Sequence, residues 1–139
     1  MAGVPLVPCM KCEDCQKGNY SLCKHYSFIG SREFGSFAEY VVVPVKYAVK
    51  FEESVSFEQG ALFEPATVAL HGLKRVPYQG GKTVAVLGGG TIGMFVAQWA
   101  KIFGAKEVVI FDIVNERLEL GKRLGATSGI NTKEEDFME

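Results

Sequence analysis

Four cysteines lie close together near the start of the chain, at Cys9, Cys12, Cys15 and Cys23. Their spacing, C-x2-C-x2-C-x7-C, brings four thiolates close enough to surround one tetrahedral ion with short loops between the ligands. Four protein ligands leave no open position on the metal. The pattern therefore predicts a structural zinc site rather than a catalytic one.

Two other uses of these cysteines remain open. Two disulfides would also consume four thiols, although disulfides are rare in cytosolic proteins. An iron–sulfur cluster is the second alternative, because the first three cysteines match the start of a bacterial ferredoxin pattern. In that pattern the fourth cysteine follows after three residues and precedes proline, whereas here seven residues intervene and Lys24 follows Cys23. The spacing favours zinc.

A second candidate site is the glycine-rich segment 88–93, GGGTIG, which fits G-x-G-x-x-G. An apolar run precedes it, a helical pattern follows it, and Asp112 ends the next apolar run 19 residues after Gly93. This context is typical of a dinucleotide-binding turn. The alternative is a glycine turn of an unrelated α/β fold, with Asp112 solvated.

Each position of the turn has a predicted role. Gly88 permits a tight turn, Gly90 lets the backbone approach a pyrophosphate, and Gly93 allows close packing of helix on strand. The backbone N–H groups of Thr91 and Ile92 would face the phosphates at the positive end of the helix.

Two side chains bear on the choice of nucleotide. Asp112 is predicted to accept hydrogen bonds from the adenosine ribose hydroxyls and to repel a 2′-phosphate, which favours NAD over NADP. Arg117, five residues later, would reach the adenosine end, so the strictness of that preference stays open.

The elements that must hold these residues follow from local patterns. Residues 36–50 are rich in β-branched and aromatic side chains and predict a strand. Residues 54–76 show helical periodicity, with Pro65 expected to open a second helix, and 77–81 form a turn. The elements expected after that turn are strand 83–87, helix 91–103, strand 108–111, helix 115–124 ended by Gly125, and a further strand at 128–131.

Composition excludes several classes of function. The chain has 139 residues, and its 15 basic side chains nearly balance 16 acidic ones, so no charge field predicts binding to nucleic acid or to a membrane. The apolar runs are too short to span a bilayer, and the first residues do not resemble a signal peptide. A cytoplasmic protein is expected.

The order of these features resembles the zinc-dependent medium-chain dehydrogenase/reductase superfamily. The matching features are the cysteine segment, then residues 35–40 (GSFAEY), then the glycine turn. Three further segments resemble its polyol dehydrogenase branch: 4–9 (VPLVPC), 28–32 (FIGSR) and 63–71 (FEPATVALH).

The resemblance implies an α/β chain with three parts. Residues 1–50 would be the C-terminal part of a GroES-like β domain with the structural zinc lobe. Residues 51–78 would be a helical connection, and 79–139 the first half of an NAD-binding Rossmann sheet.

It also implies an activity and further site residues. The parent enzyme would use NAD and a catalytic zinc to oxidise a secondary alcohol of a polyol or polyol phosphate, of the galactitol-1-phosphate or sorbitol type, to the ketone. Glu64 would be a ligand of the catalytic zinc, its alternative being a residue that stabilises a helix N-terminus. Arg32 would contact a substrate phosphate, its alternative being an exposed loop arginine. His71 lies ~10.5 Å further along the helix, too far to share an ion with Glu64.

Other ligands that the family uses for its catalytic zinc are not found in this sequence. We therefore expect this chain alone to be an inactive part of a longer enzyme, itself a homodimer or homotetramer. Incomplete sheets would also expose strand edges that invite self-association. The first alternative function is a non-catalytic, zinc-stabilised binding or assembly module, and the second is an iron–sulfur electron carrier.

Overall fold

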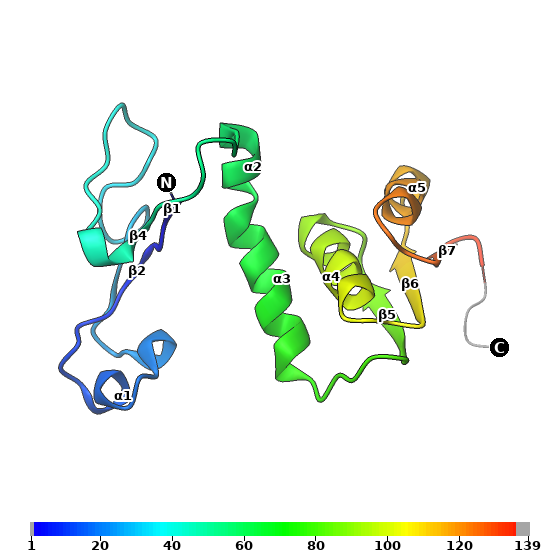
Figure 1. Cartoon of the computed structure of the whole chain (residues 1–139), viewed down its shortest axis with the longest axis horizontal. Coiled ribbons are helices and arrows are strands. Elements are labelled where there is room, and N and C mark those ends of the chain that lie inside the picture. Colours follow the sequence, from blue (N-terminus) through cyan, green and yellow to red (C-terminus); the bar gives the residue numbers. More distant parts are fainter. Residues whose placement is uncertain (1, 136–139) are drawn as a thin grey trace. The chain divides into compact units, whose positions relative to one another are not determined.

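The structure is a computed structural model that describes residues 2–135 (Figure 1). Residue 1 and the last four residues of the predicted Rossmann half, 136–139, lie outside the described part. The chain divides into two compact units, Met1–Ala61 and Leu62–Glu139, called here the N-terminal and C-terminal units.

The N-terminal unit contains little regular structure. Two short antiparallel pairs hold it together, β1 (Ala2–Gly3) with β4 (Ala48–Val49) and β2 (Leu6–Val7) with β3 (Ser27–Phe28). Its remaining elements are helix α1 (Glu13–Gln16), the 3₁₀ helices η1 (Tyr20–Leu22) and η2 (Val45–Tyr47), and helix α2 (Phe57–Ala61).

The predicted strand at 36–50 is wrong over most of its length. Only Ala48–Val49 is a strand, and residues 36–44 form neither helix nor strand. The physical reason is the lack of a partner, because no strand in the described residues pairs with 36–44. Strand propensity acts through pairing and burial, and Val42 remains 90% exposed.

The C-terminal unit contains a parallel sheet in the order β5-β6-β7. Its strands are β5 (Thr83–Leu87), β6 (Glu107–Asp112) and β7 (Ser128–Asn131). The crossover helices are α4 (Thr91–Ile102) and α5 (Asn115–Arg123). The predicted alternation of strand and helix is confirmed, including the third strand and the left-handed Gly125 (φ 117°) after α5.

Helix α3 (Phe63–Arg75) precedes the sheet. Pro65 is its third residue rather than its first, and its missing N–H falls in the first turn, where no helical acceptor exists. The indole N–H of Trp99 on α4 donates to the carbonyl of Ala66 (2.9 Å), and the Tyr78 hydroxyl lies 3.3 Å from the carbonyl of Ala100. These contacts make α3 part of the C-terminal unit.

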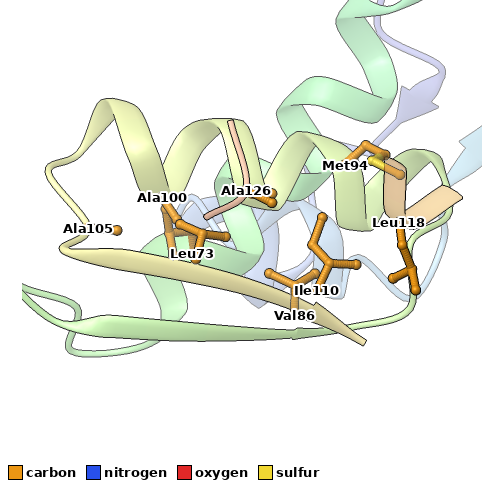
Figure 2. Packing of buried hydrophobic residues seen from close by; sticks show 10 residues of the cluster. Leu73, Val86, Met94, Ala100, Ala105, Ile110, Leu118 and Ala126 are labelled. Atoms are coloured by element: carbon orange, nitrogen blue, oxygen red, sulfur yellow. The ribbon is translucent and has the colours of Figure 1, made fainter. Parts of the chain in front are cut away.

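The core of this unit lies between the sheet and its helices (Figure 2). Val108 and Ile110 of β6 are completely buried, whereas Val109 and Phe111, which alternate with them along the strand, are partly exposed, as the two-residue period of a strand requires. Met94 of α4 and Leu118 of α5 are in the same cluster as Ile110, so both helices cover one face of the sheet (Figure 2). Among the described residues, no helix has the length and apolar character needed to cross a membrane.

Candidate metal centre and nucleotide-binding edge

The structure brings the four cysteines into one cluster. All four Sγ atoms lie within 4.8 Å of one another, with Cys9 and Cys15 at 4.0 Å and Cys12 and Cys23 at 3.9 Å. A zinc ion bound to four sulfurs at ~2.3 Å would space them ~3.8 Å apart. The donor set therefore fits one tetrahedral zinc. The same distances are nearly twice an S–S bond of ~2.05 Å, and the four thiols are free.

Backbone geometry between the first two cysteines aims donors at sulfur. Met10 has a positive φ of 61°, which is unusual for a side chain of its size and turns the chain sharply. The N–H groups of Lys11 and Cys12 then each lie 3.4 Å from Cys9 Sγ, and the Cys9 N–H donates to Cys23 Sγ at 3.3 Å. Such donors stabilise sulfur in its thiolate form.

The thiols differ in how readily they ionise. Hydrogen bonds from the backbone of Lys11 and Cys12 lower the pKa of Cys9 to about 6. Burial raises the pKa of Cys15 to about 12, since a buried thiolate lacks solvation. The cluster thus combines a thiol that ionises readily with one whose thiolate needs a nearby cation.

The glycine turn joins β5 to α4. Gly88 has a φ of 101°, and its N–H donates to the carbonyl of Phe111 at 2.8 Å. A Cβ at Gly93 would lie 1.9 Å from the carbonyl oxygen of Gly88, so no side chain fits there. Gly90 is the N-cap of α4 and makes no side-chain cap hydrogen bond. A hollow of about 550 Å³ opens beside this turn and the end of β5.

Asp112 ends the neighbouring strand and contacts the turn directly. One carboxylate oxygen accepts the N–H of Gly89 (2.7 Å), and the other accepts the N–H groups of Ile113 (2.8 Å) and Val114 (2.9 Å). The guanidinium of Arg117 lies 3.6 Å from the first oxygen. Burial alone would raise the pKa of Asp112, but these hydrogen bonds and the charge of Arg117 lower it. Asp112 is therefore ionised at neutral pH.

This position of Asp112 is a feature that sequence reasoning missed. The sequence assigned Asp112 to the ribose only, whereas in the structure its carboxylate is 6% exposed and ties the glycine turn to β6. Asp112, Arg117, Gly88 and Thr132 also line a second hollow of about 430 Å³. The ends of β5 and β6 therefore meet at the carboxyl edge of the sheet, where open α/β folds bind ligands.

A polar network at the end of β7 was also missed. Asn131 is 3% exposed and donates to Asn115 at the start of α5 (2.7 Å). Its own side-chain carbonyl accepts the N–H of Lys133 (3.0 Å), and the N–H of Thr132 donates to the carbonyl of Asp112 (3.1 Å). These bonds fix the wall of the second hollow. The only local signal was two asparagines flanking the last predicted helix and strand.

Glu64 lies in the first turn of α3 and is exposed, as is His71 on the same helix. The Thr67 hydroxyl donates to the backbone carbonyl of Glu64 at 2.8 Å. Among the described residues, the potential metal ligands that lie within 4.8 Å of one another are the four cysteines, and Glu64 is not one of that group. Glu64 is thus not brought together with further ligands.

Arg32 is exposed but has defined partners. Its guanidinium donates to the carbonyl of Tyr26 (2.7 Å) and lies 4.0 Å above the centre of the Tyr26 ring. These contacts tie Arg32 to its own loop.

Comparison with known proteins assigns both parts of the chain. Residues 2–53 match the alcohol dehydrogenase GroES-like domain, and residues 91–139 match the zinc-binding dehydrogenase family. Galactitol 1-phosphate 5-dehydrogenase from Escherichia coli K12 is 44% identical over 134 residues, which are 96% of this chain and 39% of that protein. Sorbitol dehydrogenase from Bacillus subtilis is 36% identical over 136 residues, which are 97% of this chain and 38% of that protein.

Solved structures with a similar fold are also dehydrogenases. The crystal structure of galactitol-1-phosphate dehydrogenase from Escherichia coli has a TM-score of 0.89 at 44% identity, over 97% of this chain and 39% of that one. A zinc-binding dehydrogenase from Sinorhizobium meliloti, bound to NADP, has a TM-score of 0.93 at 36% identity, over 97% and 40%. The chain thus spans about two fifths of these relatives. With a four-cysteine cluster preceding a parallel βαβαβ unit, it belongs to the zinc-dependent medium-chain dehydrogenase/reductase superfamily.

Proposed function

We propose that this chain supplies the structural zinc lobe and the first half of the NAD-binding unit of a polyol dehydrogenase. The main support is the contact between Asp112 and Gly89, which joins a glycine turn to the acidic end of the next strand. A turn that tolerates no side chain at Gly93 and begins a helix without a side-chain cap suits a bound pyrophosphate.

In this proposal the residues at the carboxyl edge of the β5-β6-β7 sheet bind NAD. The bound cofactor would accept the hydride. The N–H groups of Thr91 and Ile92 donate to the pyrophosphate, and Gly88 and Gly90 let it approach the backbone. Asp112 uses the one lone pair left on the oxygen that accepts the N–H of Gly89 for a ribose hydroxyl, and its negative charge disfavours the extra phosphate of NADP.

Arg117 is proposed to lie along the adenosine. Its side chain is 54% exposed and adjoins the Asp112 carboxylate in the second hollow. A planar guanidinium there can pack against a flat base while it stays paired with the carboxylate.

The cysteine cluster is proposed to hold zinc for stability only. Cys9, Cys12, Cys15 and Cys23 would fill all four positions of the ion, so none remains for substrate. In its described residues, the unit around them has two short strand pairs, and a bound metal would contribute directly to its folding.

The substrate class is proposed from the relatives, two of which are named for galactitol 1-phosphate and sorbitol. The whole enzyme would oxidise a secondary alcohol of a small polyol or polyol phosphate, with Glu64 among the ligands of its catalytic zinc. Arg32 would reach a substrate phosphate only if that phosphate displaced or shared its contacts with Tyr26. This chain alone is expected to show no turnover, and the parent enzyme to be a homodimer or homotetramer in the cytoplasm.

Two measurements test the proposal. Metal analysis of the purified chain should give one zinc per chain, and a Cys15→Ser variant should give less. NADH should quench the emission of Trp99, the single tryptophan, whereas Gly93→Ala should abolish the effect. A brown iron-containing protein would refute the zinc assignment. A wild-type chain whose Trp99 emission does not change at millimolar NADH would refute the nucleotide site.

A non-catalytic assembly module remains the second candidate, favoured by the large apolar surface of the N-terminal unit. That module would bind zinc but not NADH. The same pair of measurements therefore separates the two functions.

A further inference from the structure

The end of β7 carries a buried polar side chain to which the proposed function gives no task. Asn131 is 3% exposed, and Asp112 is the other polar residue buried to this degree in the described part of the chain. Burying an amide costs free energy unless its donors and its acceptor are paired. Both groups of the Asn131 side chain are paired.

The Asn131 side chain has one possible orientation. Its Oδ1 accepts the backbone N–H of Lys133 (3.0 Å), and its Nδ2 donates to Oδ1 of Asn115 (2.7 Å). The Lys133 N–H can only donate, so the Asn131 oxygen faces it and the NH₂ group must face Asn115. The hydrogen bond between the two asparagines is called here the amide bridge.

The amide bridge joins two segments that are distant in sequence. Asn115 is the first residue of α5, whereas Asn131 is the last residue of β7 and precedes a turn at 132–135. Helix and strand lie side by side (Figure 1), so close that a Cβ at Gly129 would lie 3.0 Å from the Cβ of Leu118. Leu118 thus holds the body of the helix against the strand, and the amide bridge holds the first residue of the helix.

Both joined segments line the second hollow. Arg117 lies in the first turn of α5, two residues after Asn115. Thr132 directly follows Asn131. Arg117 and Thr132 both line the hollow of about 430 Å³. The amide bridge therefore fixes the distance between these two lining residues.

Few other bonds do this work. In the part of the chain that the structure describes, the hydrogen bonds between the start of α5 and the segment 131–135 all involve the Asn115 side chain. One is the amide bridge, and the other is the bond from the Asn115 amide to the Glu134 carboxylate (3.2 Å). Asn115 and Glu134 are both exposed, so the amide bridge contains the one buried partner.

We propose that Asn131 is a positioning residue for the adenosine end of the cofactor, because the amide bridge holds Arg117 and Thr132 at the separation that adenosine needs. The inference rests on the proposed nucleotide-binding function, and it adds a residue that acts through the lining residues. A preorganised hollow binds more tightly, since no ordering of its walls opposes binding. Loss of the amide bridge should therefore weaken binding of the adenosine end.

The test is the affinity of the zinc-loaded full chain for ADP-ribose, which contains the adenosine and pyrophosphate of NAD but no nicotinamide. Calorimetric titration should show binding to the wild type. Asn131→Ala removes both side-chain bonds, and Asn115→Ala removes the amide bridge from an exposed position. Each variant should raise the dissociation constant about 10-fold, as expected when one buried hydrogen bond is lost.

Two further variants separate positioning from general stability. Asn115→Asp keeps an acceptor for the Asn131 amide in the first turn of a helix, where a carboxylate is favourable, so it should restore most of the affinity. Val84→Ala is the matched control, because Val84 packs against the core at the start of β5, at the other end of that strand from the glycine turn. It should lower the free energy of unfolding in urea, as Asn131→Ala does, but leave the affinity for ADP-ribose unchanged.

A wild type that binds ADP-ribose no better than Asn131→Ala and Asn115→Ala do would overturn this inference and leave the proposed function intact. An equal loss of affinity in Val84→Ala would overturn it too, because general destabilisation would then be the cause. The same holds if Asn115→Asp binds no more tightly than Asn115→Ala, and this pair decides alone should Asn131→Ala fail to fold. A wild type that does not bind ADP-ribose would overturn the proposed function together with the inference.

Discussion

Replacing Asp112 with asparagine should destabilise the C-terminal unit far more than the loss of one surface charge. In the wild type the carboxylate accepts three backbone N–H groups, from Gly89, Ile113 and Val114. Asparagine can keep its oxygen on the latter two, but its NH₂ group then faces the N–H of Gly89. Two donors point at each other, and one charge-assisted hydrogen bond is lost.

The magnitude follows from that geometry. A hydrogen bond to a charged group contributes about 1.5–3 kcal/mol. Arg117, at 3.6 Å and 54% exposed, adds less than about 1 kcal/mol because solvent screens it. Asp112→Asn should therefore lower the free energy of unfolding by about 2–3 kcal/mol, and the affinity for NADH should fall with it because the turn is no longer fixed.

The assay is urea unfolding at pH 7, followed by the fluorescence of Trp99, which reports on the C-terminal unit alone. Glu119→Gln is the matched control, because it removes one carboxylate charge from a pair with Lys122 on the surface of α5. That change should cost less than about 1 kcal/mol. If the two variants lose the same small amount, Asp112 does not fix the turn and the reasoning is refuted.

Three further predictions concern the same sites. Gly93→Ala should abolish NADH binding in a calorimetric titration, because its Cβ would meet the Gly88 carbonyl at 1.9 Å; Gly90→Ala, with nothing within 4 Å, should leave the C-terminal unit folded. Chelation of the metal should make residues 9–23 sensitive to proteolysis while Trp99 fluorescence stays constant, and loss of both signals together would contradict separate units. Finally, because the folded state lowers the pKa of Asp112, its contribution to stability is present above about pH 4 and should be lost as the pH falls further; an Asp112→Asn variant with the same pH slope would contradict this.

The C-terminal unit was predictable because its signals are local. A short apolar run at 108–111, a helix begun by glycines and a strand ended by Asp112 can each be recognised without distant contacts. The cysteine cluster was predictable for the same reason, since its ligands lie within fifteen residues.

What could not be predicted depends on partners. Residues 36–44 have the composition of a strand, but a strand needs a second strand, and the described residues supply none. The position of Arg32 above the Tyr26 ring depends on a turn of the chain that brings these two residues, six apart in sequence, into contact. Glu64 has a role only where further ligands meet it, which no spacing in this chain can specify.

The bond between Trp99 and Ala66 has a consequence for anyone who recombines members of this superfamily. Because of this bond, α3, with Glu64 in its first turn, belongs to the same unit as the β5-β6-β7 sheet and not to the unit of the cysteine lobe. A chimera joined between Ala61 and Leu62 would inherit helix and sheet as a co-adapted pair. A chimera joined at the Gly80–Gly81 turn would instead pack α3 of one protein against Trp99 of another. It would also separate Glu64, a candidate metal ligand, from the residues that are proposed to set the cofactor preference.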